Sequence, residues 1–340
     1  MSESDWLEFF PSGTPVVALP NWASPRILIA ADSIRGRWQR SAVFPAYRGI
    51  AKLRKILLRA RACIDSSIRT AHGSWYLEEV LSRVDLQHLQ PSAVIFGTPG
   101  PAQKITIQLT DENREAKAYL KFGVRQAARA RLENEWRVLS HLPPNLAPRA
   151  IWHGPLANGF ALLVEAVPGR PLRARLSPRR PVIEYLRRLP VERTTGDHPW
   201  LTQLWNASEM LRPTIEVLST NPQPVVVGHG DFAPWNLVSY HAIITPIDWE
   251  YGSLKSFPGA DFVYYILQVG ALIRRWRPEI AARSASELVL KAGILKLSER
   301  EAFALVRLVA FDAWNKSLED GQPSDNYLQR WRERVWKGSV

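Results

Sequence analysis

This sequence lacks most of the features that mark secreted or membrane-spanning chains. It has one cysteine, Cys63, in 340 residues, which excludes an internal disulfide and a thiolate metal cluster. It contains no run of eighteen or more apolar residues, so we expect no membrane-spanning helix. Its first ten residues, MSESDWLEFF, are acidic and lack the basic start and apolar core of a signal peptide. We therefore expect a cytoplasmic protein.

Acidic side chains are also scarce. The chain has 32 Asp and Glu against 44 Lys and Arg, a net charge of +12. Such an excess fits nucleic acid, an anionic membrane face or an anionic substrate as a partner, and it fits plain solubility equally well. Because net charge is the only sign of nucleic-acid binding, we do not expect a nucleic acid as partner. The sequence gives no sign of the oligomeric state.

Residues 1–90 form an extension whose role the sequence does not reveal. Apolar runs at 16–19 and 27–31 predict two strands. The segment 47–62 predicts a helix that is apolar on one face and basic on the rest. A basic amphipathic helix can lie on a membrane surface, but we favour a helix that packs on its own domain and exposes its basic side. The apolar face consists of Ile50, Leu53, Ile56, Leu57 and Ala60.

The remainder predicts an α+β protein in two parts. Residues 91–166 alternate between apolar and polar at period two and predict a small antiparallel sheet that carries one helix. Residues 167–340 are periodic at helical spacing and predict a mainly helical part. The expected strands are 94–97, 104–109, 116–122 and 160–165; the expected helices are 127–142, 181–190, 199–219, 258–276, 278–293, 298–319 and 323–337, with Ser298 and Glu301 as a capping box.

Two nearby segments, VVVGHGDFAPWNLV and IDWE, concentrate polar side chains at turns. In the first, an apolar strand leads into His-Gly-Asp, and Asn236 follows Asp231 by five positions. Residues 237–247 predict a tight hairpin, which returns the chain to where it began and brings Asp248 beside Asn236. We therefore expect Asp231, Asn236 and Asp248 to converge at one end of a hairpin.

These three side chains suit phosphoryl transfer. The reaction needs a carboxylate that orients and deprotonates the attacking hydroxyl, and oxygen ligands for Mg²⁺ on the phosphates. Asp231 is the candidate base, and Asn236 and Asp248 are the candidate metal ligands. Each residue alone could be a turn former, but their order and spacing together indicate a catalytic site.

The segments HGDFAPWNL and IDWE resemble the motifs of the aminoglycoside phosphotransferase and choline kinase superfamily. Its motif reads His-Gly-Asp, four residues, Asn, and later Ile-Asp-Trp or Ile-Asp-Phe, so Asp231, Asn236 and Asp248 match position for position. The resemblance implies a two-lobed protein-kinase-like fold with an N-lobe at 91–166. It implies an ATP- and Mg²⁺-dependent transfer of phosphate to a small-molecule hydroxyl, with GTP as an alternative donor. Asp261 matches a residue that braces the catalytic loop.

In the N-lobe the resemblance assigns nucleotide-binding residues. Lys121, on a strand, resembles the lysine that holds the phosphates, and Glu135 on the next helix resembles its ion-pair partner. Glu133 is the rival partner, and spacing alone does not decide between the two glutamates.

Two backbone segments complete the implied nucleotide site. The segment from Glu165 to Val167 resembles the hinge whose backbone meets adenine. The turn that begins at Gly97 stands where the phosphate loop would be, but Pro99 and Pro101 remove N–H donors from it.

Three further expectations concern the class of protein and its acceptor. A protein kinase needs a long activation segment. Only twelve residues separate Asp248 from Asp261, which leaves no room for such a segment. A non-catalytic nucleotide-binding protein of this fold is a second alternative, although no catalytic residue is missing. Residues 150–340 hold 23 basic and 19 acidic side chains, and eight arginines lie between 170 and 193. We therefore expect a neutral or anionic acceptor, such as a sugar or sugar phosphate, rather than a polycationic aminoglycoside.

Overall fold

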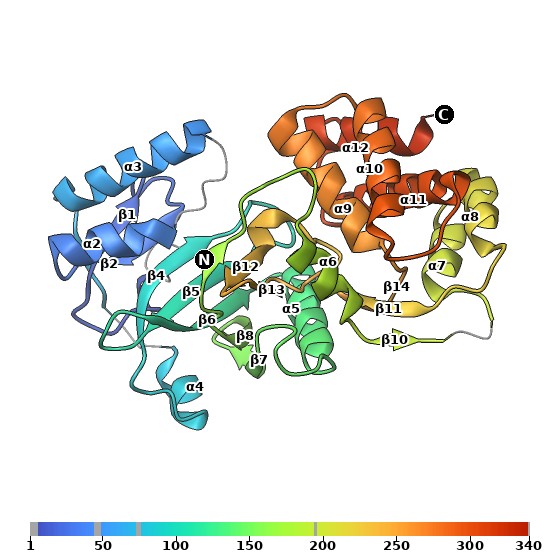
Figure 1. Cartoon of the computed structure of the whole chain (residues 1–340). Helices are drawn as coiled ribbons and strands as arrows, with labels where there is room; N and C mark the ends of the chain where they lie inside the picture. Colours follow the sequence, from blue (N-terminus) through green and yellow to red (C-terminus); the bar gives the residue numbers. More distant parts are fainter. Residues whose placement is uncertain (1–5, 44–48, 73–75, 194–195, 339–340) are drawn as a thin grey trace. The chain divides into compact units, whose positions relative to one another are not determined.

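The computed structural model describes residues 6–43, 49–72, 76–193 and 196–338 (Figure 1). The chain divides into two compact units, which we call the N-unit and the C-unit. None of the described helices combines the length and the apolar content needed to cross a membrane. The N-unit comprises Met1–Trp136 and Arg149–Val167, and the C-unit comprises Arg137–Pro148 and Pro168–Val340.

An eight-stranded antiparallel sheet forms the centre of the N-unit. The strands lie in the order β3-β1-β2-β4-β5-β6-β8-β7. Because β1, β2 and β3 belong to this sheet, residues 1–90 share one unit with 91–166, and no boundary between units occurs near residue 90. The strands are β1 (Pro15–Leu19), β2 (Ile27–Ala30), β3 (Arg69–Thr70), β4 (Gln90–Phe96), β5 (Ile105–Thr110), β6 (Ala116–Gly123), β7 (Ala150–Leu156) and β8 (Gly159–Glu165).

Helices cover both faces of the first strands. Side chains alternate along β2, so that Ile29 enters one hydrophobic core and Leu28 enters another on the opposite face. The first core includes Ala62 of α3 (Gly49–Ile64), which lies beside α2 (Ile34–Arg40) in Figure 1. The second core receives Val80 and Leu81 of α4 (Glu78–Arg83). The sheet is thus buried on both sides at this edge.

Helix α3 forms at the predicted place, but the packing expected for it is wrong. Residues 47 and 48 of the predicted span lie outside the described part of the chain. The apolar side chains Leu53, Ile56 and Leu57 are exposed by 60, 54 and 61%. The helix instead turns Ala62 toward the sheet, so its apolar stripe faces away from the domain that was expected to cover it.

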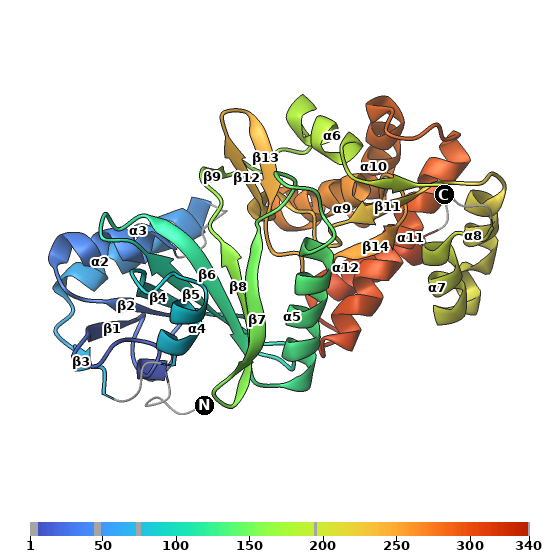
Figure 2. The same cartoon turned by 90° about the horizontal axis from the view of Figure 1, so that it is seen from below.

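The C-unit is mainly helical, with two three-stranded sheets of order β10-β11-β14 and β13-β12-β9 (Figure 2). The predicted helix 199–219 is two helices, and the predicted helix 258–276 passes into a short π-helix at Val269–Arg274. The strands are β9 (Arg170–Pro171), β10 (Val191–Glu192), β11 (Val225–Gly228), β12 (Leu237–Tyr240), β13 (Ile243–Pro246) and β14 (Ser253–Ser256). The helices are α6 (Arg180–Arg187), α7 (Pro199–Ala207), α8 (Arg212–Ser219), α9 (Ala260–Gln268), α10 (Pro278–Ala292), α11 (Glu299–Glu319) and α12 (Tyr327–Lys337), and α5 (Gln126–Leu139) begins in the N-unit.

Two local predictions in the C-unit are confirmed. The Ser298 side chain accepts from the Glu301 N–H, and the Glu301 carboxylate accepts from the Ser298 N–H, which makes the predicted capping box at the start of α11. Strands β12 and β13 form the predicted hairpin. Its two turn residues, His241 and Ala242, have φ values of 46° and 64°, the left-handed pair that a two-residue hairpin turn requires.

Candidate active site

The loop after β11 follows a path that only glycine permits. Gly230 has a φ of 78°, in the left-handed region. A Cβ atom at Gly230 would lie 2.2 Å from the carbonyl oxygen of Tyr251. The loop therefore passes directly against the backbone that follows the hairpin, and this close approach fixes the direction in which the next residue, Asp231, leaves the strand.

A buried carboxylate holds the loop in place. Asp261, in the first turn of α9, accepts the His229 N–H on Oδ2 at 2.7 Å and the Gly230 N–H on Oδ1 at 3.0 Å. Burial raises the pKa of Asp261, while His229 and the two N–H bonds lower it. Asp261 thus satisfies two loop donors that no strand or helix would satisfy, which is the bracing contact that the resemblance implies.

His229 links the loop to the hairpin. Its side chain is fully buried. Nδ1 accepts the Asp231 N–H at 3.2 Å, and Nε2 lies 2.9 Å from the carbonyl oxygen of Ile247. Because a carbonyl oxygen only accepts, Nε2 is the donor of this bond. His229 is therefore a structural residue that sets the distance between the loop and the end of β13.

The Asp231 carboxylate is fixed by two neutral donors. Asn236 Nδ2 donates to Asp231 Oδ2 at 2.8 Å and to the Asp231 carbonyl oxygen at 2.9 Å. The Tyr264 hydroxyl donates to Asp231 Oδ1 at 2.7 Å. Burial raises the pKa of Asp231, as does the negative charge of Asp248, whereas the bonds from Tyr264 and Asn236 lower it. Tyr264 has no counterpart among the residues predicted from sequence.

The hairpin brings the end of β13 back to Asn236. Leu237 pairs with Pro246, and the Ile247 N–H donates to the Asn236 carbonyl at 2.8 Å. Asp248 follows immediately, with a left-handed φ of 68°, and its charge acts on Asp231. The structure therefore places the three predicted side chains around one end of the hairpin.

Asn236 and Asp248, which lie near Asp231, fit as ligands of a divalent cation whose other ligands are mostly phosphate oxygens. Because the Asn236 amide nitrogen is used by Asp231, its Oδ1 is directed elsewhere and is the atom a cation would use. Among the described residues, no cluster of three or more His, Cys, Asp or Glu could hold a metal by itself. Mg²⁺ is usually held by one or two carboxylates together with phosphate oxygens and water, so Asn236 and Asp248 fit this type of site.

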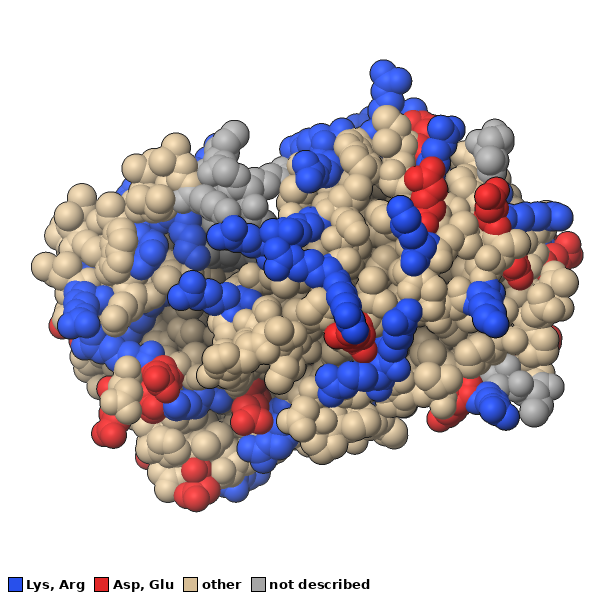
Figure 3. Space-filling view, viewed as in Figure 1, with Lys and Arg blue, Asp and Glu red and all other residues tan. Residues whose placement is uncertain are grey.

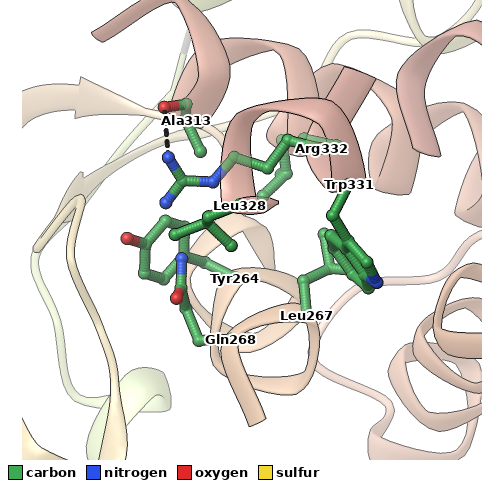
Figure 4. Close-up of a pocket in the computed structure, with 9 residues that line it drawn as sticks. Tyr264, Leu267, Gln268, Ala313, Leu328, Trp331 and Arg332 are labelled. Carbon is green, nitrogen blue, oxygen red and sulfur yellow. Dashed lines mark hydrogen bonds between the residues drawn. The ribbon is translucent and has the colours of Figure 1, made fainter. Parts of the chain in front are cut away.

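Tyr264 also lines a small cavity within the C-unit (Figure 4). Figure 4 shows Tyr264, Gln268 and Arg332 on one side of Leu328, with Trp331 on the other. Arg332 is buried and donates to the Ala313 carbonyl at 3.0 Å. Burial raises the pKa of Tyr264 far above its ordinary value, and the nearby charge of Asp231 adds to this effect. The phenol therefore stays protonated and remains a donor to Asp231.

In the N-unit, a buried ion pair connects β6 with α5. Lys121 Nζ lies 2.6 and 2.8 Å from the two carboxylate oxygens of Glu135, and both side chains are buried. Glu133 instead accepts from Arg129 at 2.8 Å on the surface. The structure therefore pairs Lys121 with Glu135, the alternative that the spacing left open.

The other predicted nucleotide-binding residues lie at strand ends of the same unit. The Gly97 N–H donates to the Lys104 carbonyl at 2.8 Å, and a Cβ at Gly97 would lie 2.7 Å from that oxygen, so the β4–β5 turn closes tightly. Glu165 is the exposed last residue of β8, and its carboxylate lies 3.5 Å from Arg149 Nε. Val167 is the last residue of the N-unit.

The chain was compared with known proteins. A scan against protein-family models and a search of curated proteins found no match. Solved structures that resemble it include a candidate aminoglycoside phosphotransferase from Ralstonia eutropha, with a TM-score of 0.45, 13% identity and coverage of 77% of this chain and 94% of that one. An amicoumacin kinase solved with AMP-PNP and Ca²⁺ has a TM-score of 0.43, 15% identity and coverage of 77% and 96%. Plasmodium vivax ethanolamine kinase has a TM-score of 0.45, 14% identity and coverage of 72% and 81%.

At these identities and TM-scores the similar structures do not determine what this chain acts on. The fold follows from the elements of the chain itself: an antiparallel sheet with a helix joined to it by a buried Lys–Glu pair, then a helical unit with a His-Gly-Asp loop and a hairpin. This is the two-part α+β architecture that the HGDFAPWNL and IDWE segments indicate.

Proposed function

We propose that this protein is a phosphotransferase that moves the γ-phosphate of ATP, with Mg²⁺, to a hydroxyl group of a small molecule. The observation that carries the proposal is the setting of Asp231. Its carboxylate is held in one orientation by Asn236 and Tyr264. Asp231 also follows Gly230, whose N–H donates to the buried carboxylate of Asp261. A fixed carboxylate whose partners are neutral donors suits a group that must accept a proton from an attacking hydroxyl.

In this proposal Asp231 receives the proton of the acceptor hydroxyl as its oxygen bonds to the γ-phosphorus and the bond from that phosphorus to the bridging oxygen of ADP breaks. Asn236 and Asp248 would hold Mg²⁺, which supplies neutralisation of the phosphate charge. Lys121, oriented by Glu135, would bind the phosphates. The segment from Glu165 to Val167 would meet the base through its backbone, which leaves GTP as an alternative donor.

The charge of the C-unit supports a neutral or anionic acceptor, such as a sugar or a sugar phosphate. All eight arginines from Arg170 to Arg193 are exposed, and Lys and Arg outnumber Asp and Glu on the face seen in Figure 3. Such a surface repels a polycationic aminoglycoside, although salt limits this effect to about 8–10 Å. The short segment between Asp248 and α9, which contains β14, leaves no room for a peptide-binding activation segment.

The experiment that tests the proposal follows labelled phosphate from ATP to a panel of acceptors. The panel contains neutral sugars, anionic sugars and kanamycin-like amines, each with the wild-type protein and with Asp231→Asn. We expect the wild-type protein to transfer phosphate to a neutral or anionic hydroxyl compound, and we expect Asp231→Asn to lose this transfer. Transfer only to the amines would refute the acceptor class, and equal transfer by the variant would refute the role of Asp231.

The metal is tested by binding rather than turnover. We expect calorimetric titration with ATP to show weak binding in EDTA and tighter binding with Mg²⁺, and we expect Asp248→Ala to remove the difference. Asp197→Ala, an exposed carboxylate of the same unit, is the matched control and should keep it. Equal affinity of the wild-type protein in both buffers would favour the non-catalytic nucleotide-binding alternative.

A further inference from the structure

Helices α2 and α3 of the N-unit expose an unusual amount of apolar surface. Fourteen large apolar side chains are exposed in the described part of the chain, and six of them lie on these two helices. Their exposed fractions range from 39 to 84%. Clustered exposed apolar side chains mark an interaction site, whereas single ones do not. We call the outward side of these two helices the α2–α3 face; its apolar part on α3 consists of Leu53, Ile56, Leu57 and Ile64.

The orientation of α3 is fixed by its charged side chains. Arg59 donates from Nε and Nη2 to the Trp38 carbonyl, at 3.1 and 2.9 Å, and its guanidinium lies 4.1 Å from the centre of the Trp38 ring. Lys55 Nζ donates to the Ala42 carbonyl. These bonds end on carbonyls at and just beyond the end of α2, where a helix leaves carbonyl groups without intrahelical partners. Because Lys55 and Arg59 are used in this way, the opposite side of α3 must face outward.

That opposite side is a continuous apolar stripe. Leu53, Ile56, Leu57 and Ile64 follow one another at intervals of three, one and seven residues, which places them on one face of a helix. Arg54 and Arg61 are exposed and flank this stripe on one edge. The helix therefore presents apolar side chains outward with arginines beside them.

The charged residues of α2, α3 and the segment between them are all basic. From residue 34 to residue 64 the sequence contains nine Lys and Arg and no Asp or Glu. In Figure 3 the surface over α3 shows basic side chains among residues of other kinds and no acidic ones. Arg35 and Arg54 are exposed without an ion-pair partner among the described residues, while Arg61 lies 3.7 Å from Asp65. The partner of this face must therefore tolerate apolar contact and carry negative charge.

We propose that the α2–α3 face binds the surface of an anionic membrane, with its apolar side chains in the headgroup region and its arginines on the lipid phosphates. An amphipathic helix with arginine beside an apolar stripe is typical of this mode of binding. A second copy of the chain would bring two basic surfaces together, and a nucleic acid would leave the leucine and isoleucine side chains in water. The membrane satisfies both the charge and the apolar stripe.

Vesicle co-sedimentation of the full chain tests the proposal. Vesicles of phosphatidylcholine alone are compared with an equal mixture of phosphatidylcholine and phosphatidylglycerol. We expect binding to the mixture only. The paired substitution Leu53→Gln and Leu57→Gln should weaken it by at least about tenfold, because the apolar contact is lost. Arg54→Gln with Arg61→Gln should weaken it by roughly thirtyfold, since each basic residue contributes about 1 kcal/mol at an anionic surface.

The matched control is Ile243→Gln with Ile280→Gln, two similarly exposed apolar residues of the C-unit, and it should bind as the wild-type protein does. All substitutions are at exposed positions, and an unchanged melting temperature confirms that each variant is folded. Absence of binding to the anionic vesicles overturns the proposal. Equal loss in the control does so as well, because the α2–α3 face would then have no special role. A dimer that forms without lipid and is lost in the leucine variant would assign the face to a second copy instead.

Discussion

The two units hold their carboxylates in opposite ways. In the N-unit, Glu135 is bonded on both oxygens by the ammonium group of Lys121. In the C-unit, Asp231 and Asp261 are bonded only by neutral groups: backbone N–H, an amide and a phenol. Within the described part of the chain, no lysine or arginine hydrogen-bonds either aspartate. The N-unit therefore neutralises its charge internally, whereas the C-unit retains negative charge near the predicted metal ligands.

This difference has a chemical meaning. A carboxylate that a lysine neutralises is a poor proton acceptor, but it orients the lysine toward an anion. A carboxylate held by neutral donors has no cation bonded to it, and burial raises the pKa of both Asp231 and Asp261, which favours proton acceptance. The pairing thus suits phosphate binding in one unit and proton and cation binding in the other.

The largest effect that we expect is on turnover. Asp231→Asn removes the proton acceptor while keeping the shape, so kcat should fall by about 10²–10⁴. Nucleotide affinity should change little, because the variant keeps the loop and its brace. Steady-state kinetics on an acceptor found in the panel, with calorimetry for ATP, measures both. If the variant kept a kcat near that of the wild-type protein, Asp231 would not be the proton acceptor. The proposed difference between the carboxylates of the two units would then be wrong.

The second expected effect is on the stability of the N-unit. Lys121→Met removes the buried ammonium group that contacts both carboxylate oxygens of Glu135, which costs about 3–5 kcal/mol. Arg129→Met breaks the exposed pair with Glu133 on the same helix and should cost less than about 1 kcal/mol. Denaturant unfolding of the two variants compares them. A similar small loss in both would show that the buried pair contributes no more than a surface one.

The corresponding change in the C-unit is Asp261→Ala. It leaves the buried N–H groups of His229 and Gly230 without an acceptor, at a cost of roughly 2–4 kcal/mol. Asp197→Ala is the exposed control and should be nearly neutral. Thermal unfolding followed by circular dichroism gives the difference. If the two variants melted together, Asp261 would not be the brace of the loop.

The smallest expected effect concerns pH. Asp231 accepts a proton only when ionised, so activity is lost as pH falls through its pKa, which burial raises above that of an ordinary aspartate. Tyr264→Phe removes a donor that lowers this pKa, so the acid limb of kcat should move to higher pH. Turnover at the optimum should fall by roughly 2–10-fold, the value of one hydrogen bond.

The control for this prediction is the neighbouring residue on α9. Tyr265→Phe also removes a buried phenol, but Tyr265 makes no contact with Asp231 among the described residues. The acid limb of its kcat–pH profile should lie at the same pH as that of the wild-type protein. If the kcat–pH profile of Tyr264→Phe coincided with that of the wild-type protein, Tyr264 would not position the base.

The sequence predicted the residues whose chemistry depends on local spacing. Asn236 and Asp248 lie at the two ends of one short hairpin, so their proximity follows from strand pairing alone. Tyr264 could not be found in this way, because its contact with Asp231 depends on how α9 packs on the loop, thirty-three residues away. The available signal was a polar-tipped aromatic one turn after Asp261, but Tyr265 beside it carries the same signal, so the sequence does not single out Tyr264.

Elsewhere the apolar periodicity of the sequence predicted a helix or strand but not what it packs against. Periodicity identified the apolar stripe of α3, yet it does not tell which side of a helix meets the sheet; here Lys55 and Arg59 decided this by bonding backbone carbonyls. Strand β7 was not predicted, because Gly154 and Pro155 interrupt its apolar run. The antiparallel continuation of the sheet into residues 1–90 likewise depends on pairings between β2 and β4 that lie far apart in sequence.

The brace at Asp261 also has a consequence for motion. Amide hydrogens in loops usually exchange with solvent quickly, because local opening exposes them at little cost. The His229 and Gly230 amides lie in a loop, yet they are bonded to a buried carboxylate and can exchange only when α9 separates from the loop. We therefore expect this part of the candidate active site to open together with the helical core of the C-unit, on the slow timescale of that core.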